Sequence, residues 1–164
     1  MLTKHTLFIT ALTALFGGIA AADTDVHFGF DSSQLSPSAT QAIEQFASRA
    51  LSSGQAIVLD GHADPTGAAD YNVGLSLRRA EAVRDQLVKL GIDSDRIVIA
   101  SFGEDALMGG SHAQERRVSL SLSNDSIASL IDDAFTSGGT SVTWEKPVTT
   151  AQLDEPITDA VATR

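Results

Sequence analysis

The sequence predicts an α+β domain in which a mixed sheet, built in the order β-α-β-α-β-β, carries two helices packed on one face. Short apolar segments with strand periodicity recur along residues 26–122. Two longer segments with apolar residues at helical spacing separate the first three of them. Each helix lies between single strands, so the strands that it joins need crossover connections, and a mixed sheet follows.

The first strand is predicted where Val26, Phe28 and Phe30 alternate with His27, Gly29 and Asp31. This is the period of a strand with one buried face. A helix is predicted to follow from the Ser-Pro pair at 36–37, because serine is a good N-cap and proline suits the first helical position. The Ser-Ser-Gly segment at 52–54 is expected to end this helix.

Residues 55–60 (QAIVLD) are short, apolar and rich in β-branched side chains, which predicts a central strand that delivers its end at Gly61. A long helix is predicted from about Asn72 to Leu90. Gly91 follows it and suits the left-handed conformation that often ends a helix.

Two further strands are predicted at residues 96–102 (RIVIASF) and 116–122 (RRVSLSL). In the second of them, alternate residues from Val118 share one apolar face. A chain of 164 residues supports one domain of ordinary size with appendages. We therefore assign the domain to residues 23–123.

Residues 1–22 are predicted to be a secretory signal peptide. Lys4 precedes an apolar run from about Leu7 to Ala20, and small residues suit cleavage after Ala22. An uncleaved membrane anchor is the alternative, but spanning a bilayer takes about 20 mostly apolar residues and this run is shorter. The sequence has no cysteine, so neither a disulfide nor a lipid-modified cysteine is expected. We expect an exported protein without a membrane span.

The charge balance excludes one class of partner. The sequence has 11 Lys and Arg against 21 Asp and Glu, a formal net charge of −10. A polyanion such as DNA or RNA would be repelled by this balance, because nucleic-acid binding depends on the neutralisation of phosphates by basic side chains. We expect no nucleic-acid partner.

After Ser123 the composition changes to Ser, Thr, Asp and Pro, so residues 124–164 are predicted to form an acidic tail. The tail is not uniform. A short amphipathic helix is predicted near residues 126–136, and beyond it only Val142 and Trp144 indicate a strand.

This short helix is expected to begin at a cap, Asn124 or Asp125. Its apolar side chains recur at helical spacing: Ile127, Leu130, Ile131, Ala134 and Phe135. A helix of this length is marginal on its own, so we expect it to pack on its own domain. The alternative is a partner protein that binds four of these side chains: Ile127, Leu130, Ile131 and Phe135.

Several polar groups are predicted to meet where the central strand ends and the long helix begins. Asp64 lies in a turn, Asp-Pro-Thr-Gly, directly after the strand. On the helix, Asn72 and Arg79 are seven positions apart and point within about 20° of each other, with Leu75 between them. A carboxylate and a forked guanidinium together suit the ammonium and carboxylate of an amino acid. The alternative is that Asp64 and Arg79 simply pair with each other.

Enzyme chemistry finds little support in the sequence. His62 is close to Asp64, but it lies on a different segment from His27 and His112, and none has metal-ligand spacing. No serine lies in a G-x-S-x-G turn, and no pair of carboxylates suits glycoside cleavage. We expect no catalytic residue, no metal and no cofactor.

The segment from Gly61 to Val83, GHADPTGAADYNVGLSLRRAEAV, resembles the signature of the OmpA C-terminal-like family of peptidoglycan-binding domains, which includes OmpA, MotB and Pal. The resemblance covers roughly Val26 to Ser123 and continues in Phe30-Asp31, Leu35, Gly91-Ile92, Arg96-Ile97, Phe102-Gly103-Glu104 and Arg116-Arg117-Val118. It implies an OmpA-like fold and non-covalent binding of peptidoglycan through the diaminopimelate of the stem peptide. It also implies a periplasmic, wall-associated protein in the cell envelope, with outer-membrane association left open.

The same resemblance implies roles for six residues. Asp64 would hold the diaminopimelate through its loop, and Arg79 would take the free carboxylate. Three further positions would complete the pocket: Asn72, the Leu75 backbone and, on the far wall, Asp31. Arg116 would turn into the pocket from its strand.

Two positions depart from the family pattern. Ala63 replaces the usual threonine beside the aspartate, and Glu115 stands where asparagine is common. The lost hydroxyl and the added negative charge predict weaker binding, or a different tilt of the peptide.

Overall fold

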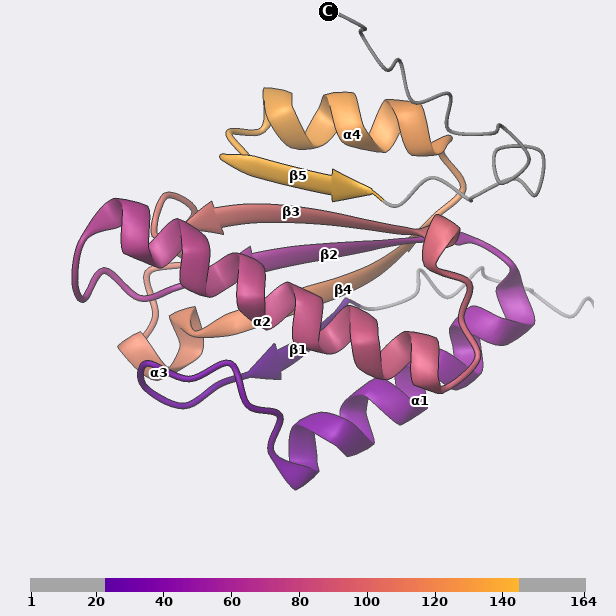
Figure 1. Ribbon diagram of the computed structural model, residues 1–164, viewed down its shortest axis with the longest axis horizontal. Coiled ribbons are helices and arrows are strands. Elements are labelled where there is room, and N and C mark those ends of the chain that lie inside the picture. The colour runs from indigo at the N-terminus through magenta and orange to yellow at the C-terminus, as the bar shows by residue number, and fades with distance from the viewer. Residues whose placement is uncertain (1–22, 145–164) are drawn as a thin grey trace, which may run out of the picture.

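The computed structural model describes residues 23–144. The predicted signal peptide and residues 145–164 of the predicted tail lie outside the described residues. The elements follow one another as in Figure 1: β1 (Thr24–His27), α1 (Pro37–Ser53), β2 (Ala56–His62), α2 (Ala69–Lys89), the 3-10 helix η1 (Ser94–Arg96), β3 (Ile97–Gly103), α3 (His112–Glu115), β4 (Arg117–Ser123), α4 (Ile127–Thr136) and β5 (Ser141–Trp144). Among the described residues no helix has the length and apolar character needed to cross a bilayer.

The strands form one mixed sheet in the order β1-β4-β2-β3-β5. β2 and β3 are parallel, as the crossover through α2 requires, and the other neighbours are antiparallel. Leu59 of β2 lies opposite both Ile99 of β3 and Leu120 of β4. The predicted α+β fold with a mixed sheet is confirmed.

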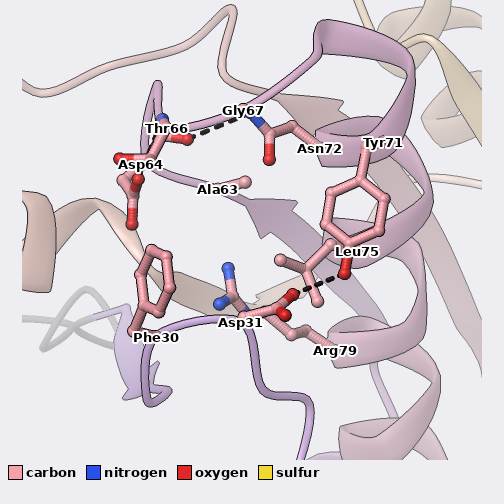
Figure 2. A pocket seen from close by; sticks show the side chains of 10 residues that line it. All are labelled: Phe30, Asp31, Ala63, Asp64, Thr66, Gly67, Tyr71, Asn72, Leu75 and Arg79. Atoms are coloured by element: carbon pink, nitrogen blue, oxygen red, sulfur yellow. Dashed lines mark hydrogen bonds between the residues drawn. The ribbon is translucent and has the colours of Figure 1, made fainter.

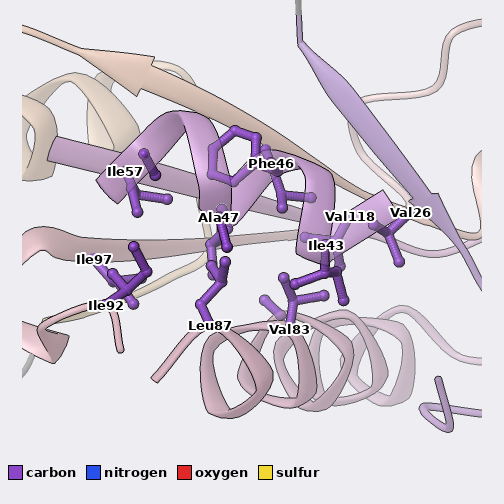
Figure 3. Packing of buried hydrophobic residues seen from close by; sticks show 14 of the residues in the cluster. Val26, Ile43, Phe46, Ala47, Ile57, Val83, Leu87, Ile92, Ile97 and Val118 are labelled. Carbon is purple, nitrogen blue, oxygen red and sulfur yellow. The ribbon is translucent and has the colours of Figure 1, made fainter. Parts of the chain in front are cut away.

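α1 and α2 cover one face of this sheet and enclose the main core (Figure 3). Ile43 and Phe46 of α1 are buried there, as are Val83 and Leu87 of α2 and Ile57 of β2. Full burial of one such side chain contributes about 1.5–3 kcal/mol, so this face contributes strongly to the stability of the fold.

The other face of the sheet is covered by α4 along β3. Alternate residues of a strand point to opposite faces, so Ala100 and Phe102 point away from α1 and α2. They form a second cluster with Ala134 of α4, and Val142 of β5 packs against it. Every residue of β3 is therefore buried.

The packing of α4 agrees with the expectation that the short helix lies on its own domain. Leu130 and Ala134 are buried, whereas Phe135 is 57% exposed. The helix begins one residue later than the predicted caps allow, because the Ser126 side chain accepts the hydrogen bond from the Ser129 amide. β5 pairs with β3, so the sheet continues beyond the domain end assigned at Ser123.

The helix ends follow the predicted capping signals closely. The Ser36 hydroxyl accepts a hydrogen bond from the Ala39 amide at 3.1 Å, and Gly54 ends α1 with φ 68°. After α2, Gly91 adopts φ 94°, and the Ile92 amide donates back to the Leu87 carbonyl at 3.1 Å. This is the hydrogen-bond pattern of a helix that ends at a left-handed glycine.

The first strand is shorter than its alternation predicts. β1 ends at His27, and the chain turns through Asp31, a non-glycine residue with φ 48°. Phe28 remains buried, but Phe30 lies beyond the strand and is 67% exposed. The prediction of a buried Phe30 was wrong, because the turn carries this side chain away from the core.

Candidate ligand-binding site

A half-open cavity of about 200 Å³ lies between the end of β2, the start of α2 and the turn after β1 (Figure 2). Its lining consists of Phe30, Asp31, Ala63, Asp64, Thr66, Gly67, Tyr71, Asn72, Leu75 and Arg79. Five of the six candidate residues line it. The sixth, Arg116, does not line the cavity but contacts Asp64 from β4's side of the site.

Close packing of α2 on β2 and β3 brings these elements together. A Cβ at Gly61 would lie only 2.4 Å from the backbone oxygen of Ser76, so the helix can approach this closely only over a glycine. The hydroxyls of Ser76 and Ser101 hydrogen-bond each other at 2.7 Å, and the Gly103 amide donates to Ser76 at 3.1 Å. These buried bonds hold the first turns of α2 against the end of β3.

Asp64 is nearly buried, with 5% of its surface exposed. One carboxylate oxygen accepts a hydrogen bond from the Thr66 amide at 2.9 Å, and the other from the Arg116 guanidinium at 3.1 Å. Burial alone would raise the pKa of Asp64, but the hydrogen bonds from Thr66 and Arg116 outweigh it and lower this pKa below its ordinary value. The side chain is therefore negatively charged at neutral pH.

Arg79 is fully buried and held by three backbone carbonyls. Its Nε donates to Ser32 at 2.9 Å, Nη1 to His62 at 3.0 Å and Nη2 to Gly29 at 3.1 Å. A guanidinium has five N–H groups, so one on each terminal nitrogen has no hydrogen bond among the described residues. Figure 2 shows this end of the side chain reaching the space between Phe30 and Leu75.

Arg79 remains positively charged although it is buried. Burial, together with the positive charge of Arg116, lowers the pKa of Arg79 to about 10, which still leaves it protonated at neutral pH. Asp64 forms its ion pair with Arg116 and not with Arg79. The alternative of a simple Asp64–Arg79 ion pair was therefore wrong.

Asn72 and Asp31 complete the polar lining. The Asn72 amide nitrogen donates to the Asp64 carbonyl at 3.2 Å and to Glu104 Oε2 at 2.6 Å. The Tyr71 hydroxyl donates to Asp31 across the cavity mouth. This hydrogen bond raises the pKa of Tyr71. It also ties α2 to the turn that follows β1.

Several lining residues were missed from the sequence. Phe30 was assigned to a buried strand face, and Tyr71 was not singled out although it stands beside Asn72 in the motif. Thr66 and Gly67 carry only a turn signal in the sequence, which does not by itself indicate a cavity. Tyr71 directly precedes Asn72 in the first turn of the helix, and this adjacency was the available signal that Tyr71 lies near the site.

Glu115 differs most from its predicted role. It is 2% exposed and accepts hydrogen bonds from the Met108 and Gly110 amides and from Arg117, each at 3.0 Å. Burial would raise the pKa of Glu115, but these hydrogen bonds lower it. Its charge is thus neutralised within the fold, and the predicted weakening of binding by Glu115 finds no support in this geometry. Ala63 lines the cavity, so the replacement of threonine by alanine lies at the site itself.

The side chain of His62 does not line the cavity. It is buried and stacks on Phe102 with ring centroids 5.3 Å apart. Burial and the nearby charge of Arg117 lower the pKa of His62 to about 4, so it is neutral at neutral pH. Within residues 23–144 no group of three or more His, Cys, Asp or Glu side chains could hold a metal ion.

The fold and the cavity define a small α+β binding domain whose pocket holds Asp64 and Asn72 at one end and the Arg79 guanidinium, with Asp31 beside it, at the other. The OmpA family model matches residues 27–120, which is more than half of the chain. The chain belongs to the OmpA family, and the predicted resemblance is confirmed.

Curated relatives agree with this assignment. The chain is 38% identical over 104 residues to the peptidoglycan-associated lipoprotein of Pseudomonas aeruginosa. The matched region covers 60% of this chain and 62% of the relative. It is 40% identical over 85 residues to outer membrane protein A of Salmonella typhi, covering 49% of this chain and 24% of that protein. The chain thus spans less than two thirds of the length of either relative.

Solved structures show the same fold. The crystal structure of the peptidoglycan-associated lipoprotein from Burkholderia pseudomallei has a TM-score of 0.57 and 30% identity, covering 61% of this chain and 90% of that one. The C-terminal domain of Helicobacter pylori MotB also has a TM-score of 0.57, at 19% identity, covering 69% of this chain and 95% of that one. At that identity the second likeness concerns the fold alone.

Proposed function

We propose that this chain binds peptidoglycan non-covalently, with the diaminopimelate of a stem peptide held in the cavity, and that it has a structural role in the cell envelope. The family is one of binding domains and not of enzymes. Two of the relatives described above are named peptidoglycan-associated lipoproteins. The candidate ligand residues are those named from the sequence: Asp31, Asp64, Asn72, Leu75, Arg79 and Arg116.

One observation carries this proposal: Asp64 and Arg79 line the same cavity, both are charged, and they do not neutralise each other. The free end of diaminopimelate carries an ammonium and a carboxylate. The ammonium would lie at the Asp64 and Asn72 end, and the carboxylate against the two remaining N–H groups of Arg79. A ligand with only one of these charges would make only one of these two contacts, so it would bind less tightly.

The proposed location follows the proposed ligand. Removal of residues 1–22 would release an exported, periplasmic protein attached to the wall by its binding site. The relatives include an outer membrane protein and a lipoprotein. Association of this chain with the outer membrane is part of the same proposal and can be tested by fractionation of the envelope.

Sedimentation with purified diaminopimelate-type sacculi tests the function. Wild type and an Asp85→Ala control are expected to pellet, because Asp85 lies on the exposed face of α2 and pairs with Arg84. Asp64→Ala and Arg79→Ala are expected to remain in the supernatant. Thermal melts identify a variant that fails to fold. If Arg79→Ala fails to fold, Arg79→Lys is used in its place, because it keeps the positive charge. If the folded Asp64 and Arg79 variants pellet like wild type, the pocket assignment is wrong.

A role as an adaptor is the second candidate, favoured by the exposure of Phe135 on α4. In this role the domain would bind the wall and recruit a partner protein through the helix. Leu130 would not take part, since it is buried. Phe135→Ala is the sharper test than truncation after Ser123, which would also remove β5 from the sheet. An unchanged melting temperature with loss of a protein captured by wild type would support the adaptor role, and unchanged capture would exclude Phe135 from it.

A further inference from the structure

The side-chain amide of Asn72 has its orientation set by two oxygen atoms. Its Nδ2 donates one hydrogen to the Asp64 carbonyl at 3.2 Å and the other to Glu104 Oε2 at 2.6 Å. With the amide reversed, its oxygen would face a carbonyl and a carboxylate, neither of which has a hydrogen to donate. Asn72 is 2% exposed, so such a buried mismatch would not be relieved by water.

Both amide hydrogens of Asn72 are bonded to the Asp64 carbonyl and to Glu104, so the amide oxygen is the polar atom that remains to face the cavity. Figure 2 shows this oxygen directed into the cavity beside Ala63. The carboxylate oxygens of Asp64 already accept hydrogen bonds from Thr66 and Arg116. Asn72 Oδ1 is therefore an acceptor at this end of the cavity that has no hydrogen bond within the described residues.

Glu104 reaches Asn72 because β3 ends in a tight turn. Gly103 adopts φ 56°, and a Cβ there would lie 3.0 Å from the Val73 side chain. The turn is also tied to the end of β2, since the Ala63 amide donates to the Gly103 carbonyl at 2.7 Å. The chain thus passes close under the first turns of α2 and places the Glu104 carboxylate beside the Asn72 amide.

We infer that Glu104 is a positioning residue of this site: it locks the Asn72 amide with its oxygen toward the cavity, so that this end of the pocket accepts the hydrogens of a ligand ammonium. This role rests on the proposed binding of diaminopimelate. Glu104 does not touch the ligand in this scheme. Its contribution is to select, at one end of the pocket, for a group that donates hydrogen bonds.

Three variants separate positioning from other roles. Glu104→Met keeps the length of the side chain but has no strong acceptor, whereas Glu104→Gln keeps an acceptor and loses the charge. Glu44→Met is the control, because Glu44 is exposed on α1. The ligands are a synthetic stem tripeptide that ends in meso-diaminopimelate, and its analogue with hydrogen in place of the distal amine. Affinities of all four proteins for both peptides are measured by calorimetry or competition.

We expect wild type to prefer the amine-bearing peptide. In Glu104→Met this preference falls by roughly five- to tenfold, the ratio that one net hydrogen bond supports. In Glu104→Gln it stays within about twofold of wild type, since the acceptor is retained, and Glu44→Met is unchanged. In NMR spectra, the Asn72 side-chain hydrogens should exchange slowly in wild type and Glu104→Gln and faster in Glu104→Met.

Each other result has a defined meaning. A wild-type preference that persists in Glu104→Met overturns the positioning role, as does an equal loss of affinity for both peptides, which would indicate a structural role only. An equal fall of the preference in Glu104→Met and Glu104→Gln would show that the charge acts directly, and also overturns it. Absence of any preference in wild type would instead refute the proposed function, whatever the NMR exchange shows for Asn72.

Discussion

Substitution of Gly61 by alanine tests whether the close approach of α2 to β2 builds the site. The added Cβ would lie 2.4 Å from the Ser76 backbone oxygen, and contacts of this kind are essentially never shorter than 3.0 Å. The obstacle is helix backbone and not a flexible side chain, so α2 or β2 must shift by at least the difference. Overpacking of this kind costs about 1–3 kcal/mol.

The shift should also reach the pocket. Asn72 and Arg79 lie on α2, whereas Ala63 and Asp64 follow β2, so displacement of the helix separates the two ends of the charged site. In a domain of this size about 1 kcal/mol lowers the melting temperature by roughly 4–8 °C. Gly61→Ala is therefore expected to melt several degrees below wild type and to pellet less with sacculi while still folded.

Gly54→Ala is the matched control. Gly54 has φ 68° but no atom within 4 Å of an added Cβ, so the cost is backbone strain of about 1 kcal/mol at the end of α1. It should lower stability slightly and leave binding unchanged. Urea unfolding and sacculus sedimentation of both variants provide the measurements. A Gly61→Ala protein with wild-type stability and binding would refute the reasoning that this contact sets the geometry of the pocket.

Three further predictions concern individual groups. Tyr71 is the single tyrosine of the sequence, so its ultraviolet titration should show a pKa above the ordinary value of 10.0, and Asp31→Asn should lower it. Glu115→Gln leaves the buried Arg117 without its charged partner and should cost about 3 kcal/mol in urea unfolding at neutral pH. Because the pKa of Asp64 is lowered in the folded protein, its charged form stabilises the fold at pH values above the ordinary carboxyl pKa of about 4, and this stabilisation is lost as the pH falls through the lowered pKa. The difference in unfolding free energy between wild type and Asp64→Asn should therefore shrink between pH 7 and pH 3. A difference that stays constant over this range would contradict the prediction.

Elements whose signals are local were predictable from the sequence. The Ser-Pro pair at 36–37 and Gly91 mark helix ends through the conformations that these residues favour, and α1 and α2 end as expected. The two-residue period placed Val118 and Leu120 on the buried face of β4. The convergence of Asn72 and Arg79 also follows from a local rule, the pitch of one helix.

Features that depend on long-range contacts were harder to predict. Phe30 continues the alternation of β1, but a turn at Asp31 ends the pairing first. β5 is a short segment indicated only by Val142 and Trp144, and it becomes a strand because β3 offers a free edge. Glu104 lies within the family motif, but no local pattern indicates its contact with Asn72, because the two residues are 32 positions apart.

The amino-acid pattern thus predicts most of the strands and helices, their apolar faces and the family to which the chain belongs, because each depends on short spacings along the chain. The pairing of charges depends instead on distances between remote segments. Arg116, 52 positions along the chain, pairs with Asp64, and carbonyls of three distant residues hold Arg79. Folding therefore determines which of these groups remain available to a ligand.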